Sequence, residues 1–153
     1  MSLDKAREHL SRHGLADRII EFEVSSATVA LAAQALGCEE ARIAKTLSFE
    51  QGDSALLVVA AGDARVDNAK FKQRFGIKAR MLSADRVETL IGHGVGGVCP
   101  FGVNAGVPVY LDQSLRRFDV VYPAAGTSAS AVRLTIEELE RASEATDWVD
   151  VTK

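Results

Sequence analysis

Lys45 is the residue whose type fits its surroundings least. It lies in the segment Ile43–Phe49, whose alternation predicts a β-strand with Lys45 on the apolar face. An ammonium group is costly on such a face unless it meets a partner or a cavity. Lys45 therefore either snorkels at the end of the strand or faces a cavity that receives an anion or a carbonyl oxygen.

A glycine-rich segment, residues 92–102, is the second candidate for chemistry. Its sequence, Gly-His-Gly-Val-Gly-Gly-Val-Cys-Pro-Phe-Gly, lets a ligand approach main-chain N–H groups closely. It lacks the lysine and hydroxyl of a Walker loop, and no dinucleotide fingerprint opens a helix here. A tight turn between two elements explains the glycines equally well. The small residues of segment 124–128 likewise suit either a pocket wall or a simple turn.

Nucleophiles and metal ligands are sparse. His93 and Cys99 could act together as a base and a nucleophile, but a cysteine in an apolar, glycine-rich run is more often inert packing. His9 and His13 belong to a predicted surface helix. Cys38 and Cys99 form no CxxC pair, which is typical of a reducing compartment, and no Cys/His cluster has the spacing of a zinc site. We therefore expect no metal.

The composition is that of an ordinary globular chain. With 153 residues, a net charge of −3 and 47% hydrophobic residues, it predicts one domain, 1–153, and excludes both wholesale disorder and a histone-like polycation. Residues 89–111 carry no charge but contain six glycines and two prolines, which exclude a membrane helix. The charged N-terminus does not resemble a signal peptide, so a cytoplasmic protein is expected.

One basic stretch interrupts this mildly acidic chain. Residues 65–86 contain seven basic and two acidic side chains, a local charge of +5. The stretch is either a solvated helix face or a patch that holds a phosphate backbone.

Cap and turn residues predict a mixed α/β domain. Helices are expected at 3–13, from 24–27 to 36, and at 67–75, 83–91 and 136–142, with Val24 and Val29 as a hydrophobic staple. Strands are expected at 19–24, 43–49, 55–61, 77–82, 107–111, 119–122, 131–134 and 148–151. Because hairpins interrupt the alternation, a mixed sheet is expected rather than a purely parallel one.

Four segments, taken in order, resemble the YbaK/prolyl-tRNA synthetase-associated editing family. They are Thr28–Gly37, Ile43–Leu47, Gly92 with Gly96–Gly102, and Gly126 with Val132–Leu139. The resemblance covers nearly the whole chain. It implies a single compact domain, with a mixed, mostly antiparallel sheet or half-barrel surrounded by helices. It also implies an enzyme that removes wrong amino acids from charged tRNA without a metal or an organic cofactor.

The resemblance also implies roles for individual residues. The family's invariant lysine falls on Lys45, and its GxxxP loop falls on residues 96–100. The implied catalytic residues are Lys45, Gly96, Gly97 and Val98. The implied substrate-binding residues are Thr28, Thr46, Cys99, Pro100, Phe101, Gly102, Gly126 and Thr127. The basic stretch would contact tRNA through Lys70, Lys72, Arg74, Lys78 and Arg80.

The implied reaction is hydrolysis of the ester at the terminal adenosine. Such an ester is already activated, so positioning and main-chain hydrogen bonds can suffice without a strong base. The implied partners are the acceptor end of aminoacyl-tRNA and a synthetase such as prolyl-tRNA synthetase, with neither DNA nor a membrane. Two alternatives stay open: a non-catalytic module that binds tRNA or a synthetase, and a Cys99-dependent hydrolase of a small substrate.

The amino acid removed is less defined. In the alanine-specific branch an asparagine commonly follows the lysine and a histidine lies in the C-terminal part. Here Thr46 follows Lys45, and no histidine occurs after His93. Alanyl-tRNA editing in that branch's manner is therefore not expected. Cys-tRNA(Pro) and seryl-, threonyl- or other small aminoacyl-tRNAs stay open.

Overall fold

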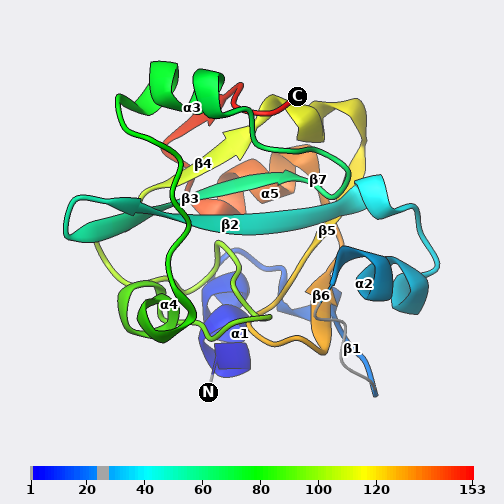
Figure 1. The fold of residues 1–153 in the computed structure, drawn as a ribbon. Helices are drawn as coiled ribbons and strands as arrows, with labels where there is room; N and C mark the ends of the chain where they lie inside the picture. Colours follow the sequence, from blue (N-terminus) through cyan, green and yellow to red (C-terminus); the bar gives the residue numbers. More distant parts are fainter. Residues whose placement is uncertain (1, 24–27) are drawn as a thin grey trace.

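The chain folds into the expected mixed α/β domain (Figure 1). A computed structural model describes residues 2–23 and 28–153. The helices are α1 (Ser2–Arg12), α2 (Val29–Leu36), α3 (Asn68–Phe75), α4 (Ala84–Ile91) and α5 (Ile136–Ser143). The strands are β1 (Ile19–Glu21), β2 (Ile43–Gln51), β3 (Ser54–Ala61), β4 (Val109–Asp112), β5 (Val120–Pro123), β6 (Ser130–Val132), β7 (Leu134–Thr135) and β8 (Asp147–Val149). Within these described residues, no helix is long and apolar enough to cross a membrane.

The main sheet has six strands in the order β7-β5-β2-β3-β4-β8, and β1 pairs separately with β6. Neighbours are antiparallel at β7–β5 and β2–β3 but parallel at β5–β2, β3–β4 and β4–β8. The curled, mixed half-barrel is confirmed. In the six-stranded sheet, three of the five neighbouring strand pairs are parallel, whereas a mostly antiparallel sheet was expected. Parallel neighbours need a crossover connection instead of a hairpin.

Strand β3 forms the centre of the sheet because its residues are apolar on both faces. Leu57 and Val59 pack into one core cluster, with residues of α1, α4 and α5, while Leu56 and Val58 pack into a second cluster with Phe71 of α3. Residues 55–61 are fully buried, as a strand covered on both faces requires. Figure 1 shows α3 and the C-terminus on one side of β2, and α1, α2 and α4 on the other.

Two predicted strands differ from the structure. Segment 77–82 makes only an isolated bridge, Phe49 to Met81, with the N–H of Glu50 donating to the Arg80 oxygen and the N–H of Leu82 donating to the Ser48 oxygen. Segment 131–134 divides into β6 and β7, since Val132 pairs with β1 whereas Leu134 pairs with β5. The expected strand end at Val24 and the Val24–Val29 staple lie outside the described residues.

Candidate functional site

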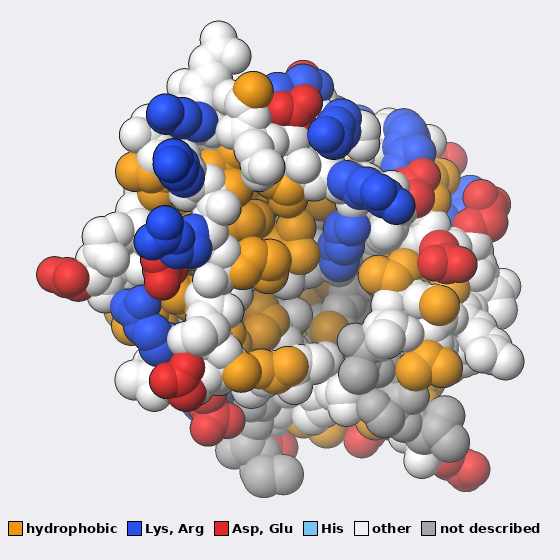
Figure 2. Space-filling model, in the orientation of Figure 1, with side chains coloured by type: hydrophobic (Ala, Val, Ile, Leu, Met, Phe, Trp, Pro, Cys, Tyr) orange, Lys and Arg blue, Asp and Glu red, His pale blue; other side chains and the backbone are white. Residues whose placement is uncertain are grey.

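A pocket of about 380 Å³ lies against β2, on the face of the strand that carries Thr46. Its walls come from α2, β2, α4, the glycine-rich segment and residues 122–131. The residues lining it are Thr28, Val29, Ala32, Ile43, Ala44, Lys45, Thr46, Ser48, Met81, Leu82, Ala84, Val87, Val95, Gly96, Val98, Tyr122, Ala124, Thr127, Ser130 and Ala131. Figure 2 shows a hollow floored by apolar side chains, with Lys and Arg side chains along parts of its rim.

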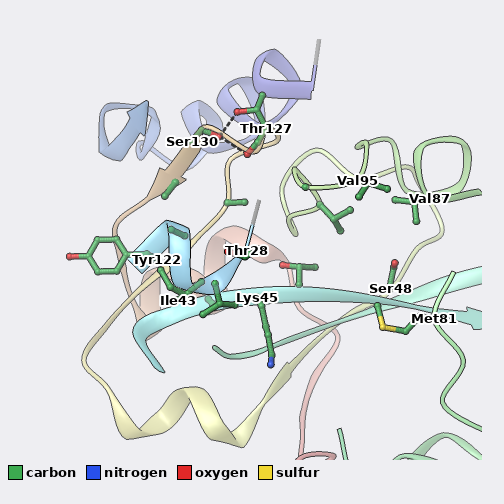
Figure 3. A pocket seen from close by; sticks show the side chains of 18 of the residues that line it. Thr28, Ile43, Lys45, Ser48, Met81, Val87, Val95, Tyr122, Thr127 and Ser130 are labelled. Atoms are coloured by element: carbon green, nitrogen blue, oxygen red, sulfur yellow. Dashed lines mark hydrogen bonds between the residues drawn. The ribbon is translucent and has the colours of Figure 1, made fainter. Parts of the chain in front are cut away.

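Hydroxyl groups are the main polar side chains of this pocket. Thr127 Oγ1 donates to Ser130 Oγ over 2.9 Å (Figure 3). Thr28 Oγ1 accepts the backbone N–H of Leu31 over 3.1 Å. Thr46 Oγ1 differs, because it is buried and has no hydrogen-bond partner among the described residues. A buried hydroxyl without a partner costs free energy, so Thr46 Oγ1 is a group that a ligand in the pocket can satisfy.

Lys45 lines the pocket with its stem, but its ammonium is directed elsewhere. Its Nζ donates to the backbone oxygens of Gly62, over 3.3 Å, and Ala64. In Figure 3 its side chain leaves β2 on the side away from Thr127. The structure therefore does not bear out the alternative in which the Lys45 ammonium faces the cavity. The partner that this lysine needed is the turn after β3, whose carbonyl groups the sequence pattern does not reveal.

Charges of both signs surround the Lys45 ammonium. Burial lowers the pKa of Lys45; the Asp63 carboxylate opposes this shift and the Arg65 guanidinium adds to it. Asp63 is itself held by Arg117, at 3.1 Å and 2.5 Å to its two oxygens. Two of the three ammonium hydrogens have carbonyl acceptors, and the third has no acceptor among the described residues.

The glycine-rich loop and the segment around Gly126 are in direct backbone contact. A Cβ placed on Gly97 would lie 2.3 Å from the Gly126 oxygen and 2.8 Å from Thr127 Cα, so only glycine fits. This contact brings the loop and Thr127 to the same pocket. Gly126 thus supports the pocket wall without lining it.

The loop can offer two main-chain donors to a ligand. Gly96 and Val98 line the pocket, and neither N–H has an acceptor in the described part of the chain. The N–H of Gly97 donates to the Gly94 oxygen over 3.0 Å, which removes it from the set of expected donors. Gly96 has a φ of 90°, a left-handed conformation that favours glycine.

Cys99 and His93 lie together but do not form a nucleophilic pair. Cys99 Sγ lies 3.5 Å from His93 Nε2, yet Nε2 also lies 2.6 Å from the Phe101 oxygen, to which it must donate its proton. Burial raises the pKa of the Cys99 thiol to about 12 and lowers the pKa of His93. A neutral thiol next to a proton-donating nitrogen is not activated, so the structure gives no support to a Cys99-dependent hydrolase.

The second half of the loop lies outside the pocket, which corrects four assignments. Cys99 and Phe101 are fully buried in the core. Pro100 and Gly102 line a different cavity, of about 440 Å³, between α1 and the end of α5. We therefore remove these four residues from the substrate-binding set. Of that set, Thr28, Thr46 and Thr127 line the pocket.

The basic stretch is partly neutralised by acidic residues near the C-terminus. Lys70 pairs with Asp150 over 3.1 Å, and Arg74 pairs with Asp147 over 3.1 Å. Arg80 lies 3.9 Å from Glu50 and is 71% exposed. Lys72 and Lys78 are exposed and have no ion-pair partner within the ranges that the structure covers. The five side chains therefore differ in how freely they can meet a phosphate.

Sequence reasoning missed two hydroxyl residues and most of the apolar residues of the pocket wall. Ser48 and Ser130 are buried hydroxyl residues of the lining, and the exposed Met81 and Val95 lie on it as well. The sequence did contain a signal for Ser48. In the alternating pattern of β2, Thr46 and Ser48 lie on the same face of the strand, opposite the face of Lys45. Ser130 carried no comparable signal, because its place depends on the pairing of β6 with β1.

Comparison with known proteins identifies the class that this fold and pocket define. Residues 23–142 match the model of the aminoacyl-tRNA editing domain, and the chain belongs to that family. YwhH of Bacillus subtilis (strain 168) is 50% identical over 154 residues, covering 100% of this chain and 98% of that protein.

Solved structures agree with this assignment. One, titled "a putative trans-editing enzyme for prolyl tRNA synthetase", has a TM-score of 0.89 and 31% identity, covering 99% of this chain and 97% of that one. Another, the protein APE2540, has a TM-score of 0.86 and 30% identity, covering 97% and 99%.

Proposed function

We propose that this protein is a free-standing deacylase that hydrolyses the ester of mischarged tRNA. The observation that carries the proposal is the unpartnered Thr46 hydroxyl, in one pocket with the free N–H groups of Gly96 and Val98. At about 380 Å³, the pocket lies within the range of about 300–1,000 Å³ usual for small-molecule sites. It therefore suits an aminoacyl group with part of its ribose.

The chemistry follows from these donors. When water attacks the ester carbonyl, negative charge develops on the carbonyl oxygen, and the N–H groups of Gly96 and Val98 would stabilise it. The bond to the ribose oxygen then breaks, and that oxygen takes a proton from the attacking water, with help from the neighbouring 2′-hydroxyl. Lys45 would hold a phosphate of the 3′ end with its remaining N–H and its charge.

The hydroxyl-rich wall favours a polar aminoacyl group. A substrate with a side-chain hydroxyl or thiol can pair with Thr46 Oγ1, whereas an alanyl methyl group leaves that oxygen unsatisfied. We therefore propose Ser-, Thr- or Cys-tRNA, including Cys-tRNA(Pro), over Ala-tRNA. A synthetase such as prolyl-tRNA synthetase would be the partner that supplies the mischarged tRNA.

The Thr46→Val variant tests this function directly. Valine keeps the shape and removes the unpartnered oxygen, so we expect the free energy of unfolding to rise by about 1 kcal/mol. Deacylation of the preferred mischarged tRNA should fall by about tenfold to a hundredfold, since the substrate loses a hydrogen bond. The measurement pairs a denaturant curve with single-turnover deacylation across a panel of seryl-, threonyl-, cysteinyl- and alanyl-tRNAs.

Thr89→Val is the matched control, because Thr89 is exposed on α4 and does not line the pocket. It should leave deacylation unchanged. Unaltered deacylation of every tRNA by Thr46→Val would remove this residue from the site. A wild-type protein that binds tRNA but deacylates none of the panel would be a binding module instead.

The basic stretch is proposed to hold the acceptor stem through Lys70, Lys72, Arg74, Lys78 and Arg80. Changing Lys72 and Lys78 together to glutamine should weaken binding to different tRNAs similarly, because phosphate contacts carry little sequence information. The slope of log affinity against log salt should become shallower by about one for each phosphate that is no longer bound. A Lys70→Gln, Arg74→Gln double variant should have a smaller effect, since acidic residues already neutralise both side chains. Binding is measured by filter binding at several salt concentrations. If all variants bind equally well, the basic stretch is a solvated helix face and does not contact tRNA.

A further inference from the structure

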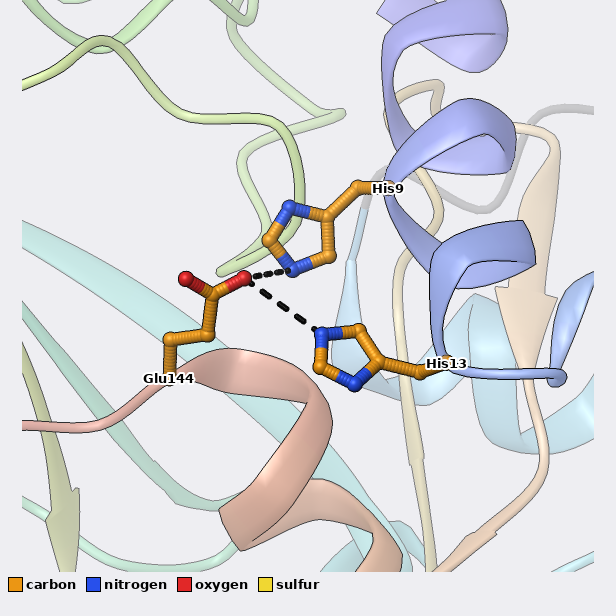
Figure 4. Close-up of side chains that lie close together, drawn as sticks. All are labelled: His9, His13 and Glu144. Carbon is orange, nitrogen blue, oxygen red and sulfur yellow. Dashed lines mark hydrogen bonds and ion pairs between the residues drawn. The ribbon is translucent and has the colours of Figure 1, made fainter.

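Three potential metal ligands converge where α1 meets the end of α5, and none of them lines the Thr46 pocket. His9 lies on α1, and His13 directly follows its last residue, so their rings stack one turn apart with centroids 5.4 Å apart. Glu144 Oε2 lies 3.2 Å from His9 Nε2 and 3.4 Å from His13 Nε2 (Figure 4). All three ligand atoms lie within 4.8 Å of one another.

These separations suit a tetrahedral ion. Bond lengths of about 2.0–2.2 Å to nitrogen and oxygen place tetrahedral ligand atoms about 3.3–3.5 Å apart. The two distances to Glu144 Oε2 therefore need little adjustment, while the two imidazole nitrogens, within 4.8 Å of each other, would draw together around the ion. Figure 4 shows both rings turning their Nε2 atoms toward the same carboxylate oxygen. Glu144 reaches this position from the first residue after α5, where its φ is 53°.

The end of α5 adds a dipole that attracts a cation. The Ala142 oxygen lies 2.6 Å from His9 Nε2, which therefore carries the proton and donates it when no ion is bound. An ion would replace that proton, which leaves to solvent, and the carbonyl oxygen would shift outward to accommodate it. The negative C-terminal end of the helix favours a cation at this place.

From this convergence we infer that His9, His13 and Glu144 form a binding site for a zinc-type divalent cation. Two imidazoles and one carboxylate are ligands that zinc takes with a fourth position open, whereas calcium and magnesium prefer oxygen ligands alone. His9 and Glu144 also line the 440 Å³ cavity, so water can reach the fourth position. Lys5 and Arg12 line the same cavity and make water or an anion suitable there.

The site resembles part of a metallopeptidase motif but lacks the general base that this motif needs. The two histidines have the four-residue spacing of the HExxH motif. The position of its general base is occupied here by Leu10, which is fully buried. The ion therefore joins α1 to α5.

Zinc titration of the intact, metal-free protein tests the site. We expect one zinc ion per chain, measured by competition with a chromogenic chelator. The melting temperature should rise by about 5–10 °C at a zinc concentration a hundred times the dissociation constant. His13→Ala and Glu144→Gln should each weaken zinc binding by at least about a hundredfold, because loss of a second-shell partner alone costs about 10–100-fold.

Glu137→Gln is the matched control, since Glu137 is an exposed glutamate of the first turn of α5 and makes the same charge change. It should keep wild-type zinc affinity. Glu144→Gly relieves the positive φ and removes the ligand, so it should remain folded without gaining stability from zinc. The inference is overturned if the wild type binds no zinc, or if zinc binds equally to the control and the ligand variants.

Discussion

Replacing Lys45 by methionine is expected to lower deacylation by about tenfold to a thousandfold and to destabilise the fold by about 1–3 kcal/mol. Both effects follow from the same group. The ammonium donates to the Gly62 and Ala64 oxygens, and without it these part-buried carbonyls lose a charged donor. The substrate would also lose the N–H and the charge proposed to hold its phosphate.

A melting curve and single-turnover deacylation, measured on the same preparation, separate these two effects. A purely structural lysine would lower the melting temperature while the folded fraction kept full activity. Lys153→Met is the control for removal of a positive charge, because Lys153 is exposed and belongs neither to the pocket nor to the proposed tRNA-binding residues. Arginine should not restore activity at position 45, since its planar fork does not fit two carbonyls arranged for an ammonium.

The second large effect is expected from Gly97→Ala. The new Cβ would lie 2.3 Å from the Gly126 oxygen and 2.8 Å from Thr127 Cα, and neither backbone atom can move without shifting a pocket wall. We expect a loss of about 1–3 kcal/mol of stability from overpacking. Deacylation should fall about a hundredfold, because displacing the loop moves the Gly96 and Val98 donors.

Gly94→Ala is a close control within the same loop. Its new Cβ would meet only Glu88 Oε2, at 3.2 Å, and this exposed side chain can move away. The variant should keep wild-type melting and activity. A Gly97→Ala protein with unchanged deacylation would show that the loop donors do not act on the substrate.

The local elements were predictable because each depends on neighbouring residues. The cap of α3 is an example: Asp67 accepts the N–H groups of Ala69 and Lys70, and Gly76 ends the helix with a φ of 75°. The capping box of Thr135 and Glu138 similarly starts α5. Caps and hairpins lie within a few positions of the residues they fix, so the sequence contains their whole cause.

The sequence also identified Lys45 as unusual but left its surroundings open. The alternation of β2 correctly separated Lys45 from Thr46. It could not tell that the Thr46 face forms the pocket, nor that the Lys45 face meets the turn after β3. Which face is hollow depends on whether helices pack closely against it, and that is set by contacts between distant segments.

Long-range contact decided the remaining features. The loop around Gly97 meets Gly126, and His9 meets Glu144, across 29 and 135 positions of the chain respectively. The first contact requires two backbones without a Cβ between them, and the second requires α1 to pack beside the end of α5. By itself the sequence determined the class of fold, its caps and the residues able to do chemistry. Only the tertiary structure decided which of them share a cavity, because burial and proximity are properties of packed elements rather than of neighbours in the chain.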